Sequence, residues 1–457
     1  MRIRNLAGIL RCDGFVAKKG RHPQSCDYWI ERGPVDIAID GTGCIRSIIN
    51  LNKSTRRPRR GNGFSAGGEE ENSSLRSSRA SVQTLRLGSG SAGLEQDTDV
   101  GDDRVIDGTG LLATPAFVDA HTHAIHAGSR AGEYFQRWAG ATYLDIAKSG
   151  GGIASTITAV EGESEESLTR ALISRLERCA ALGSALVEVK SGYAASAEGE
   201  LRMLRAITRA RDVGFDIYRT FMPLHTIPSG VTEAAWVEQM MGLLPLVAEQ
   251  KLADGVDAFV DKGFFSIDSS YRFFSEARKF GFQVRAHCDE LANIGATFIV
   301  VNMGGLSVDH LQHIRADALM LWPQASTVAT LLPATSFYLG LPFADARRLI
   351  DRGAPVALAT DYNPGTAPSP SMLFTMLLAA RHLKMSPSEI WCASTYNGAQ
   401  ALGRHEQGWI GDGNQASLCL WPDHGHTEAD AFVAELVVHQ TSPRHTISGN
   451  RVFDNAG

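Results

Sequence analysis

The stretch "PAFVDAHTH", residues 115–123, places two histidines at the end of a short apolar run. Phe117 and Val118 are typical of a buried strand, and His121 and His123 follow them two residues apart. In an extended chain, residues i and i+2 point to the same side, so both imidazoles can lie side by side at the strand end. Such a pair can bind one metal ion, although a solvated loop holding two unrelated histidines has the same spacing.

Between residues 114 and 404, short apolar runs alternate with amphipathic stretches. Alternating strands and helices predict a parallel sheet, and eight repeats favour the α/β class with a closed (β/α)8 TIM-like barrel. An open doubly wound sheet is the alternative, but it is expected to carry a Gly-rich phosphate-binding turn where this chain has His-x-His. The eight predicted strands lie in the runs 115–121, 185–192, 215–225, 256–263, 282–290, 306–313, 325–334 and 355–365.

The two ends of the chain contain further strand-like runs separated by Gly and Pro. Residues 1–113 include "IRNLAGIL" (3–10), "VDIAIDGTGCIRSII" (35–49) and "RVIDGTGLL" (104–112), and residues 405–457 include "FVAELVVHQ" (432–440). We expect these ends to pair into one small β-sandwich beside the barrel domain of residues 114–404. Residues 52–103 are rich in Ser, Gly and charge, which predicts a flexible surface insertion.

Composition limits the classes of partner. A formal net charge of −6 over 457 residues gives no basic footprint for nucleic acid. No apolar run reaches the ~18 residues of a membrane span, so no membrane partner is expected. The seven cysteines are scattered without a C-x-x-C pair, which favours a reducing compartment and predicts a cytoplasmic protein.

Polar residues gather at the ends of the predicted barrel strands. In a barrel of this type, such residues converge on the face that carries the chemistry. Taken alone, His225 or His310 is more commonly a hydrogen-bonded core residue than a ligand, whereas a buried Asp361 needs a cation or another partner. A ligand set of imidazoles and a carboxylate fits zinc or iron better than calcium or magnesium. Five of the 14 histidines lie at these strand ends: His121, His123, His225, His287 and His310.

Eight short motifs run through the chain: "PAFVDAHTH", "AGSR", "GATYLDIAKSGGGI", "EVKSGY", "AHCDEL", "SVDHLQH", "TLLPATSFYL" and "ALATDYNPGT". These motifs resemble those of the amidohydrolase superfamily and, within it, the imidazolonepropionase family. The resemblance covers nearly all of the chain outside 52–103. It implies metal-dependent hydrolysis of the cyclic amide C–N bond of 4-imidazolone-5-propanoate to N-formimidoyl-L-glutamate, a step of histidine degradation.

The resemblance also implies roles for individual residues. One Zn²⁺ or Fe³⁺ per subunit is expected, with the ligands His121, His123, His287 and Asp361. Glu290 is the implied general acid/base, and the residues that polarise the carbonyl or position the water are His225 and His310. The propionate carboxylate of a small-molecule substrate is expected to bind Arg130 and Tyr193. The pocket around substrate and product is further lined by His225, Glu290, Asn363, Gly365 and Thr366. A homodimer is expected.

The position of Glu290 conflicts with simple alternation along its strand. Counting from His287, strict alternation places Asp289 on the metal-facing side instead of Glu290. The implied role of Glu290 therefore requires the strand to end near Cys288.

Two rival functions stay open at this point. One is a superfamily deaminase or cyclic amidase that acts on a related heterocycle. The substrate of a base deaminase has no carboxylate for the enzyme to bind. The other is a metal-binding relative without catalysis that serves as an interaction module.

Overall fold

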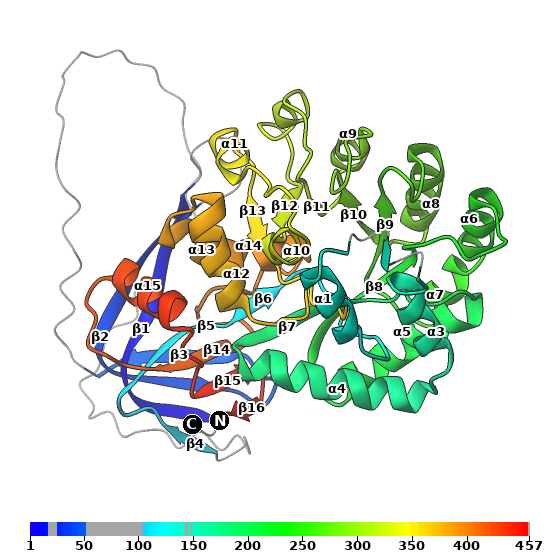
Figure 1. The fold of residues 1–457 in the computed structure, drawn as a ribbon. Coiled ribbons are helices and arrows are strands. Elements are labelled where there is room, and N and C mark those ends of the chain that lie inside the picture. The colour runs from blue at the N-terminus through cyan, green and yellow to red at the C-terminus, as the bar shows by residue number, and fades with distance from the viewer. Residues whose placement is uncertain (17–24, 52–103, 142–144, 147–148, 456–457) are drawn as a thin grey trace, which may run out of the picture.

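The computed structural model describes residues 1–16, 25–51, 104–141, 145–146 and 149–455 (Figure 1). The predicted insertion at 52–103 lies outside the described residues. Two eight-stranded sheets organise this part of the chain, one forming a barrel and the other built from both chain ends. Within the described ranges, no helix has the length and apolar character needed to cross a membrane.

The barrel sheet runs in chain order from its first strand to its eighth, and every neighbouring pair is parallel. Most of the strand positions are buried because helices cover the outer face, which explains their continuous apolar runs. Six of the strands fall inside their predicted runs, and β7 and β9 each begin one residue earlier, so the predicted fold class is confirmed. The strands are β6 (Phe117–Asp119), β7 (Ser184–Lys190), β8 (Asp216–Leu224), β9 (Gly255–Val260), β10 (Gln283–Cys288), β11 (Ser307–His310), β12 (Val328–Leu331) and β13 (Val356–Leu358).

The barrel closes just beyond the ends of β6 and β13. The backbone N–H of Asp361 donates to the carbonyl of His121 at 3.0 Å, and the N–H of His123 donates to the carbonyl of Tyr362 at 2.9 Å. The first and eighth strands therefore meet through the residues that carry the predicted metal ligands.

Helices surround the barrel, and the sequence explains their placement. In the long α4, Leu168, Leu172 and Leu176 recur every four residues and are buried, while Ser164 caps the first turn by accepting from the N–H of Ser167. The helices are α1 (Ala131–Trp138), α3 (Ile153–Glu161), α4 (Glu165–Ala181), α5 (Ala197–Asp212), α6 (Glu233–Met241), α7 (Leu244–Glu249), α8 (Ile267–Lys279), α9 (Ala296–Asn302), α10 (Pro333–Leu339), α11 (Ala346–Asp351), α12 (Met372–Leu378), α13 (Pro387–Ser394) and α14 (Tyr396–Ala401).

The second sheet joins the two chain ends beside the barrel (Figure 1). Its order is β16-β15-β14-β5-β1-β2-β3, with β4 paired to β1. Ile3, Ile37 and Leu418 belong to its own apolar core, so N- and C-terminal segments bury each other's side chains. The strands are β1 (Arg2–Val16), β2 (Ser25–Ile39), β3 (Ile45–Asn50), β4 (Val105–Asp107), β5 (Leu111–Pro115), β14 (Ser417–Pro422), β15 (His445–Ser448) and β16 (Arg451–Asp454).

One predicted strand is wrong. The run "FVAELVVHQ" lies in a helix, α15 (Ala429–His439). Its buried residues Phe432, Val433, Leu436 and Val437 repeat with helical spacing, and this periodicity outweighs the β-branched content that suggested a strand.

Phe117 links the barrel to both of its neighbours. Its buried ring lies 5.7 Å from Trp391 of α13 and 5.8 Å from Trp421 of β14, measured between ring centroids. We expect Phe117→Ala to lower the free energy of unfolding by about 3–5 kcal/mol, because it leaves a cavity between three elements. Urea unfolding of the variant measures this loss. Phe117→Leu should lower the free energy of unfolding much less, because it leaves a smaller cavity. An unchanged midpoint for Phe117→Ala would contradict this packing.

Candidate metal centre and active site

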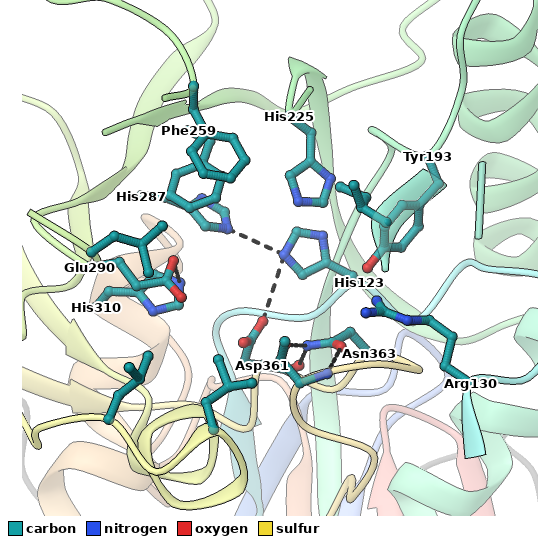
Figure 2. A pocket seen from close by; sticks show the side chains of 16 residues that line it. His123, Arg130, Tyr193, His225, Phe259, His287, Glu290, His310, Asp361 and Asn363 are labelled. Atoms are coloured by element: carbon teal, nitrogen blue, oxygen red, sulfur yellow. Dashed lines mark hydrogen bonds and ion pairs between the residues drawn. The ribbon is translucent and has the colours of Figure 1, made fainter. Parts of the chain in front are cut away.

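The predicted site residues meet at the carboxyl ends of the barrel strands. Ten of the twelve line one cavity of about 200 Å³, a size that admits a small molecule (Figure 2). His121 is fully buried beneath this cavity, and Gly365 lies against Arg130. The ten lining residues are His123, Arg130, Tyr193, His225, His287, Glu290, His310, Asp361, Asn363 and Thr366.

Four donor atoms converge as a metal ion requires. The Nε2 atoms of His123 and His287 lie 3.2 Å apart. Asp361 Oδ1 lies 3.6 Å from His123 Nε2 and 3.7 Å from His121 Nε2. With metal–ligand bonds of ~2.1 Å, tetrahedral ligand atoms stand ~3.4 Å apart, so these spacings fit a common ion. His121 Nε2 is buried without a hydrogen-bond partner among the described residues, as expected of a metal ligand.

His310 also approaches this centre. One ring nitrogen of His310 forms a compact group with donor atoms of His121 and Asp361, all within 4.8 Å of one another. His310 Nε2 lies 3.6 Å from Glu290 Oε2. His310 is therefore close both to the metal-facing donors and to the side chain of Glu290.

Two of the buried imidazoles, His121 and His123, are in the form that binds metal. Burial and nearby Lys190 lower the pKa of His121 well below its usual value, and burial and His225 do the same for His123. Neutral imidazole is the form that ligates metal ions.

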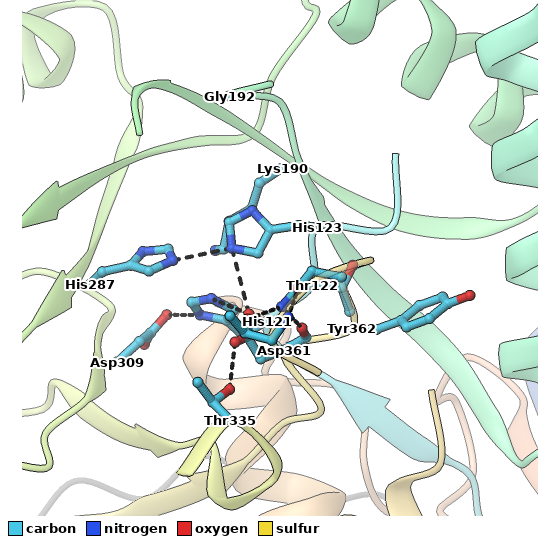
Figure 3. A network of polar contacts seen from close by, with 12 residues as sticks. His121, Thr122, His123, Lys190, Gly192, His287, Asp309, Thr335, Asp361 and Tyr362 are labelled. Carbon is cyan, nitrogen blue, oxygen red and sulfur yellow. Dashed lines mark hydrogen bonds and ion pairs between the residues drawn. The ribbon is translucent and has the colours of Figure 1, made fainter. Parts of the chain in front are cut away.

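Two buried carboxylates orient the metal-facing histidines. Asp309 Oδ2 lies 2.6 Å from His121 Nδ1 (Figure 3), and Asp257 Oδ1 lies 3.2 Å from His287 Nδ1. Each carboxylate can accept the Nδ1 proton, which leaves the Nε2 lone pair facing the metal centre. Lys190 Nζ lies 2.7 Å from Asp257 Oδ2 and balances its charge.

Sequence reasoning missed Asp257 and Asp309. The signal was present for Asp257, an acid inside the otherwise apolar strand β9. Asp309 lies between Val308 and His310 in a short strand that is already polar, so it gave no such signal.

The chain turns after β10 in the way that the role of Glu290 requires. β10 ends at Cys288, and Asp289 adopts a left-handed φ of 53°. The side chain of Asp289 accepts from Thr297 Oγ1 at 2.6 Å, so it faces away from the cavity that Glu290 lines. The alternation rule fails here because the strand has already ended.

Asp261 holds this turn in place. Its carboxylate accepts hydrogen bonds from the backbone N–H groups of residues 290, 291 and 292, at 2.9, 2.9 and 3.0 Å. Burial, then repulsion from Asp361 and Asp261, raises the pKa of Glu290 well above its usual value. A carboxyl group with this tendency to hold a proton suits proton transfer.

His225 stands on the other side of the centre. Its Nδ1 lies 3.1 Å from the carbonyl oxygen of Gly192, to which the ring N–H donates. Burial and neighbouring His287 lower the pKa of His225 to about 3, so the ring is neutral. Its Nε2 is therefore an acceptor, and its ring stacks on His123 with centroids 4.7 Å apart.

The loop after β13 folds around Asn363. The side-chain Oδ1 of Asn363 accepts from the N–H groups of Gly365 and Thr366 at 2.8 and 2.7 Å. Its Nδ2 donates to Thr366 Oγ1 at 2.7 Å and to the carbonyl of Asp361 at 2.6 Å. Asn363 thus fixes the shape of the pocket wall immediately beside the metal-facing carboxylate.

The fold and site define a class of enzyme. Residues 148–453 match the sequence pattern of the amidohydrolase family. Among solved structures, 5-methylcytosine deaminase from Klebsiella pneumoniae has a TM-score of 0.67 at 15% identity, covering 100% of this chain and 98% of that chain. E. coli guanine deaminase has a TM-score of 0.67 at 14% identity, covering 99% of this chain and 98% of that one. At such identities the likeness shows the fold alone.

Closer relatives narrow the class. The chain is 41% identical over 323 residues to the imidazolonepropionase of Caldanaerobacter subterraneus subsp. tengcongensis, covering 70% of this chain and 78% of the relative. It is also 41% identical over 334 residues to the imidazolonepropionase of Symbiobacterium thermophilum, covering 71% and 79%. The chain is thus a metal-dependent hydrolase of the amidohydrolase superfamily. Within that superfamily it belongs to the imidazolonepropionase family.

The carboxylate behind His287 should control metal affinity. We expect Asp257→Asn to weaken Zn²⁺ binding about 10–100-fold, because His287 loses the charged acceptor of its Nδ1 proton. Lys190 keeps Glu188 as a partner at 2.6 Å, so the fold is retained. Competition with a chromogenic chelator measures the affinity, and Asp212→Asn, at an exposed position, is the matched control. If Asp257→Asn and Asp212→Asn bind Zn²⁺ equally tightly, Asp257 does not control metal affinity.

Proposed function

We propose that this chain hydrolyses 4-imidazolone-5-propanoate to N-formimidoyl-L-glutamate, using one Zn²⁺ or Fe³⁺ per subunit held by His121, His123, His287 and Asp361. The observation that carries the proposal is the convergence of these four donors beside Glu290, in a cavity that Arg130 also lines. Membership of the imidazolonepropionase family supports the choice of substrate.

The steps of the reaction can be assigned to a bound ion and to Glu290. A bound ion supplies Lewis acidity and lowers the pKa of a coordinated water towards ~7. Glu290 takes a proton from the attacking water and returns it to the ring nitrogen as the C–N bond breaks. Its place beside His310 and near the metal-facing donors allows it to serve both steps.

The two remaining histidines suit different tasks. His225 presents an acceptor at Nε2, because its Nδ1 proton is donated to Gly192, so it can accept from a ring N–H or from the water. Neither ring nitrogen of His310 has a hydrogen-bond partner among the described residues, so this side chain can donate to the ring carbonyl. We assign carbonyl polarisation to His310 on this basis.

The other end of the cavity suits a carboxylate. Arg130 and Tyr193 both line it, and a planar guanidinium with a phenol donor matches a propionate group (Figure 2). A base deaminase has no carboxylate for Arg130 to bind, so this pair favours imidazolone propionate over an aminated heterocycle.

Cellular location and assembly are further parts of the proposal. None of the seven cysteines forms a disulfide, which supports the cytoplasm as the compartment. The homodimer expected from the family resemblance remains a prediction that light scattering of the purified protein can test.

The direct test combines an activity assay with metal analysis. Purified protein should consume imidazolone propionate, followed by its ultraviolet absorbance, and should contain about one zinc or iron per chain. Removal of the metal with a chelator should abolish turnover, and adding back Zn²⁺ or Fe³⁺ identifies the productive ion. A metal-loaded protein that ignores this substrate but releases ammonia from an aminated heterocycle would replace the proposal with a deaminase.

Glu290 can be tested against its immediate neighbour. Glu290→Gln should retain its metal but lose turnover by about 10²–10⁴-fold, because the amide cannot carry the proton. Asp289→Asn is the matched control: its side chain faces Thr297, and Asn tolerates the left-handed backbone at this position. Near-normal turnover by Glu290→Gln would exclude it as the proton carrier.

A further inference from the structure

Arg130 is held by a buried glutamate that the family resemblance did not single out. Glu133 Oε1 accepts from Arg130 Nε at 3.0 Å, and Oε2 accepts from Nη2 at 2.9 Å. Both side chains are less than one-tenth exposed. A guanidinium has five N–H donors, and this side-on pair uses two of them. The guanidinium of Arg130 points toward the cavity that this residue lines (Figure 2).

Glu133 is fixed from its other side. The backbone N–H of Gly152 donates to Oε1 at 2.8 Å, and Arg137 Nη2 lies 3.4 Å from Oε2. Burial opposes ionisation, but the hydrogen bonds from Arg130 and Gly152 hold the pKa of Glu133 below its usual value. The carboxylate is therefore charged at neutral pH, and Arg130, Arg137 and Glu133 together carry one net positive charge.

Gly365 provides the space in which the guanidinium lies. A Cβ atom at this position would stand 1.9 Å from Arg130 Nη1 and 2.0 Å from its Cζ, so no other residue fits without moving Arg130. The carbonyl of Gly365 accepts from Tyr134 Oη at 2.9 Å and from Arg137 Nη1 at 2.7 Å. Helix α1 and the loop after β13 thus form the two walls of one slot.

We infer that Glu133 is a positioning residue: with Gly365 it fixes the guanidinium of Arg130 so that the site selects substrates bearing a single carboxylate. This inference rests on the proposed function, because it assigns the substrate carboxylate to Arg130. One net positive charge in the slot matches one carboxylate. Holding the guanidinium before the substrate arrives removes the cost of ordering it on binding.

The test is Glu133→Gln in the full-length, metal-loaded protein. The amide nitrogen of Gln faces a guanidinium donor, so Arg130 loses one of the two bonds that it donates to residue 133, and with it its fixed orientation. We expect KM for imidazolone propionate to rise about 10–100-fold while kcat stays within about threefold, since an interaction made equally in ground and transition states is lost. Glu166→Gln, which is exposed on α4, is the matched control and should leave both constants unchanged.

Paired ligands separate positioning from general damage. Binding of 3-(imidazol-4-yl)propanoate should weaken in Glu133→Gln, whereas 4-propylimidazole, which has the same ring without the carboxylate, should bind both proteins equally. Because this readout needs no turnover, it tests the slot even if the wild-type protein fails to hydrolyse imidazolone propionate, a result that would overturn the proposed function alone. In an Arg130→Ala background, Glu133→Gln should have no further effect.

Two outcomes would overturn the inference. One is an unchanged KM and unchanged carboxylate binding in Glu133→Gln. The other is an equal loss of affinity for both ligands, which would mean that Glu133 only supports the pocket as a whole. If Glu133→Gln does not fold, Gly365→Ala tests the same slot, because its added methyl group displaces Arg130.

Discussion

The site depends on how the barrel is closed. The backbone bonds from Asp361 to His121 and from His123 to Tyr362 join the first and eighth strands beyond their regular ends. His121 and His123 thereby become neighbours of Asp361, which lies 238 or more residues further along the chain. His287 reaches the same point from β10. Several residues at these strand ends adopt left-handed backbone, which persists only where the surrounding structure imposes it: Asp289, His310, Leu311 and Asp361.

Buried acids hold four of the functional side chains around this closure: His121, His287, Glu290 and Arg130. Asp309 and Asp257 orient two metal-facing histidines, Asp261 shapes the turn that delivers Glu290, and Glu133 holds Arg130. Isolated buried charges are costly, so each acid is matched by a cation, an imidazole or backbone N–H groups. The pocket is thus preorganised at both ends, and in the proposed function one end serves the ion and its proton carrier and the other serves a carboxylate.

Much of this organisation could be predicted from the chain alone. Strand and helix periodicity located all eight barrel strands, since each is a short apolar run that alternates with amphipathic stretches. The His-x-His spacing and the acid in "ALATDYNPG" indicated the metal centre because these polar residues directly follow apolar runs. Prediction from local patterns failed at two places. The run "FVAELVVHQ" contains strand-forming residues but repeats with helical spacing, and it forms a helix. The left-handed backbone at Asp289 ends the alternation of a strand, so alternation does not predict the side on which Glu290 lies.

The sequence by itself determined the order of elements, the class of ligands and the family, because these follow from local periodicity and from motifs carried on short segments. Tertiary structure alone decided which acids support which functional groups, and that Gly365 makes room for Arg130. Those relations join residues distant in the chain, such as Asp309 with His121 and residue 365 with 130. These contacts cannot be predicted from the spacing of residues along the chain, because they form only when the strands close into a barrel and the loops pack over its end.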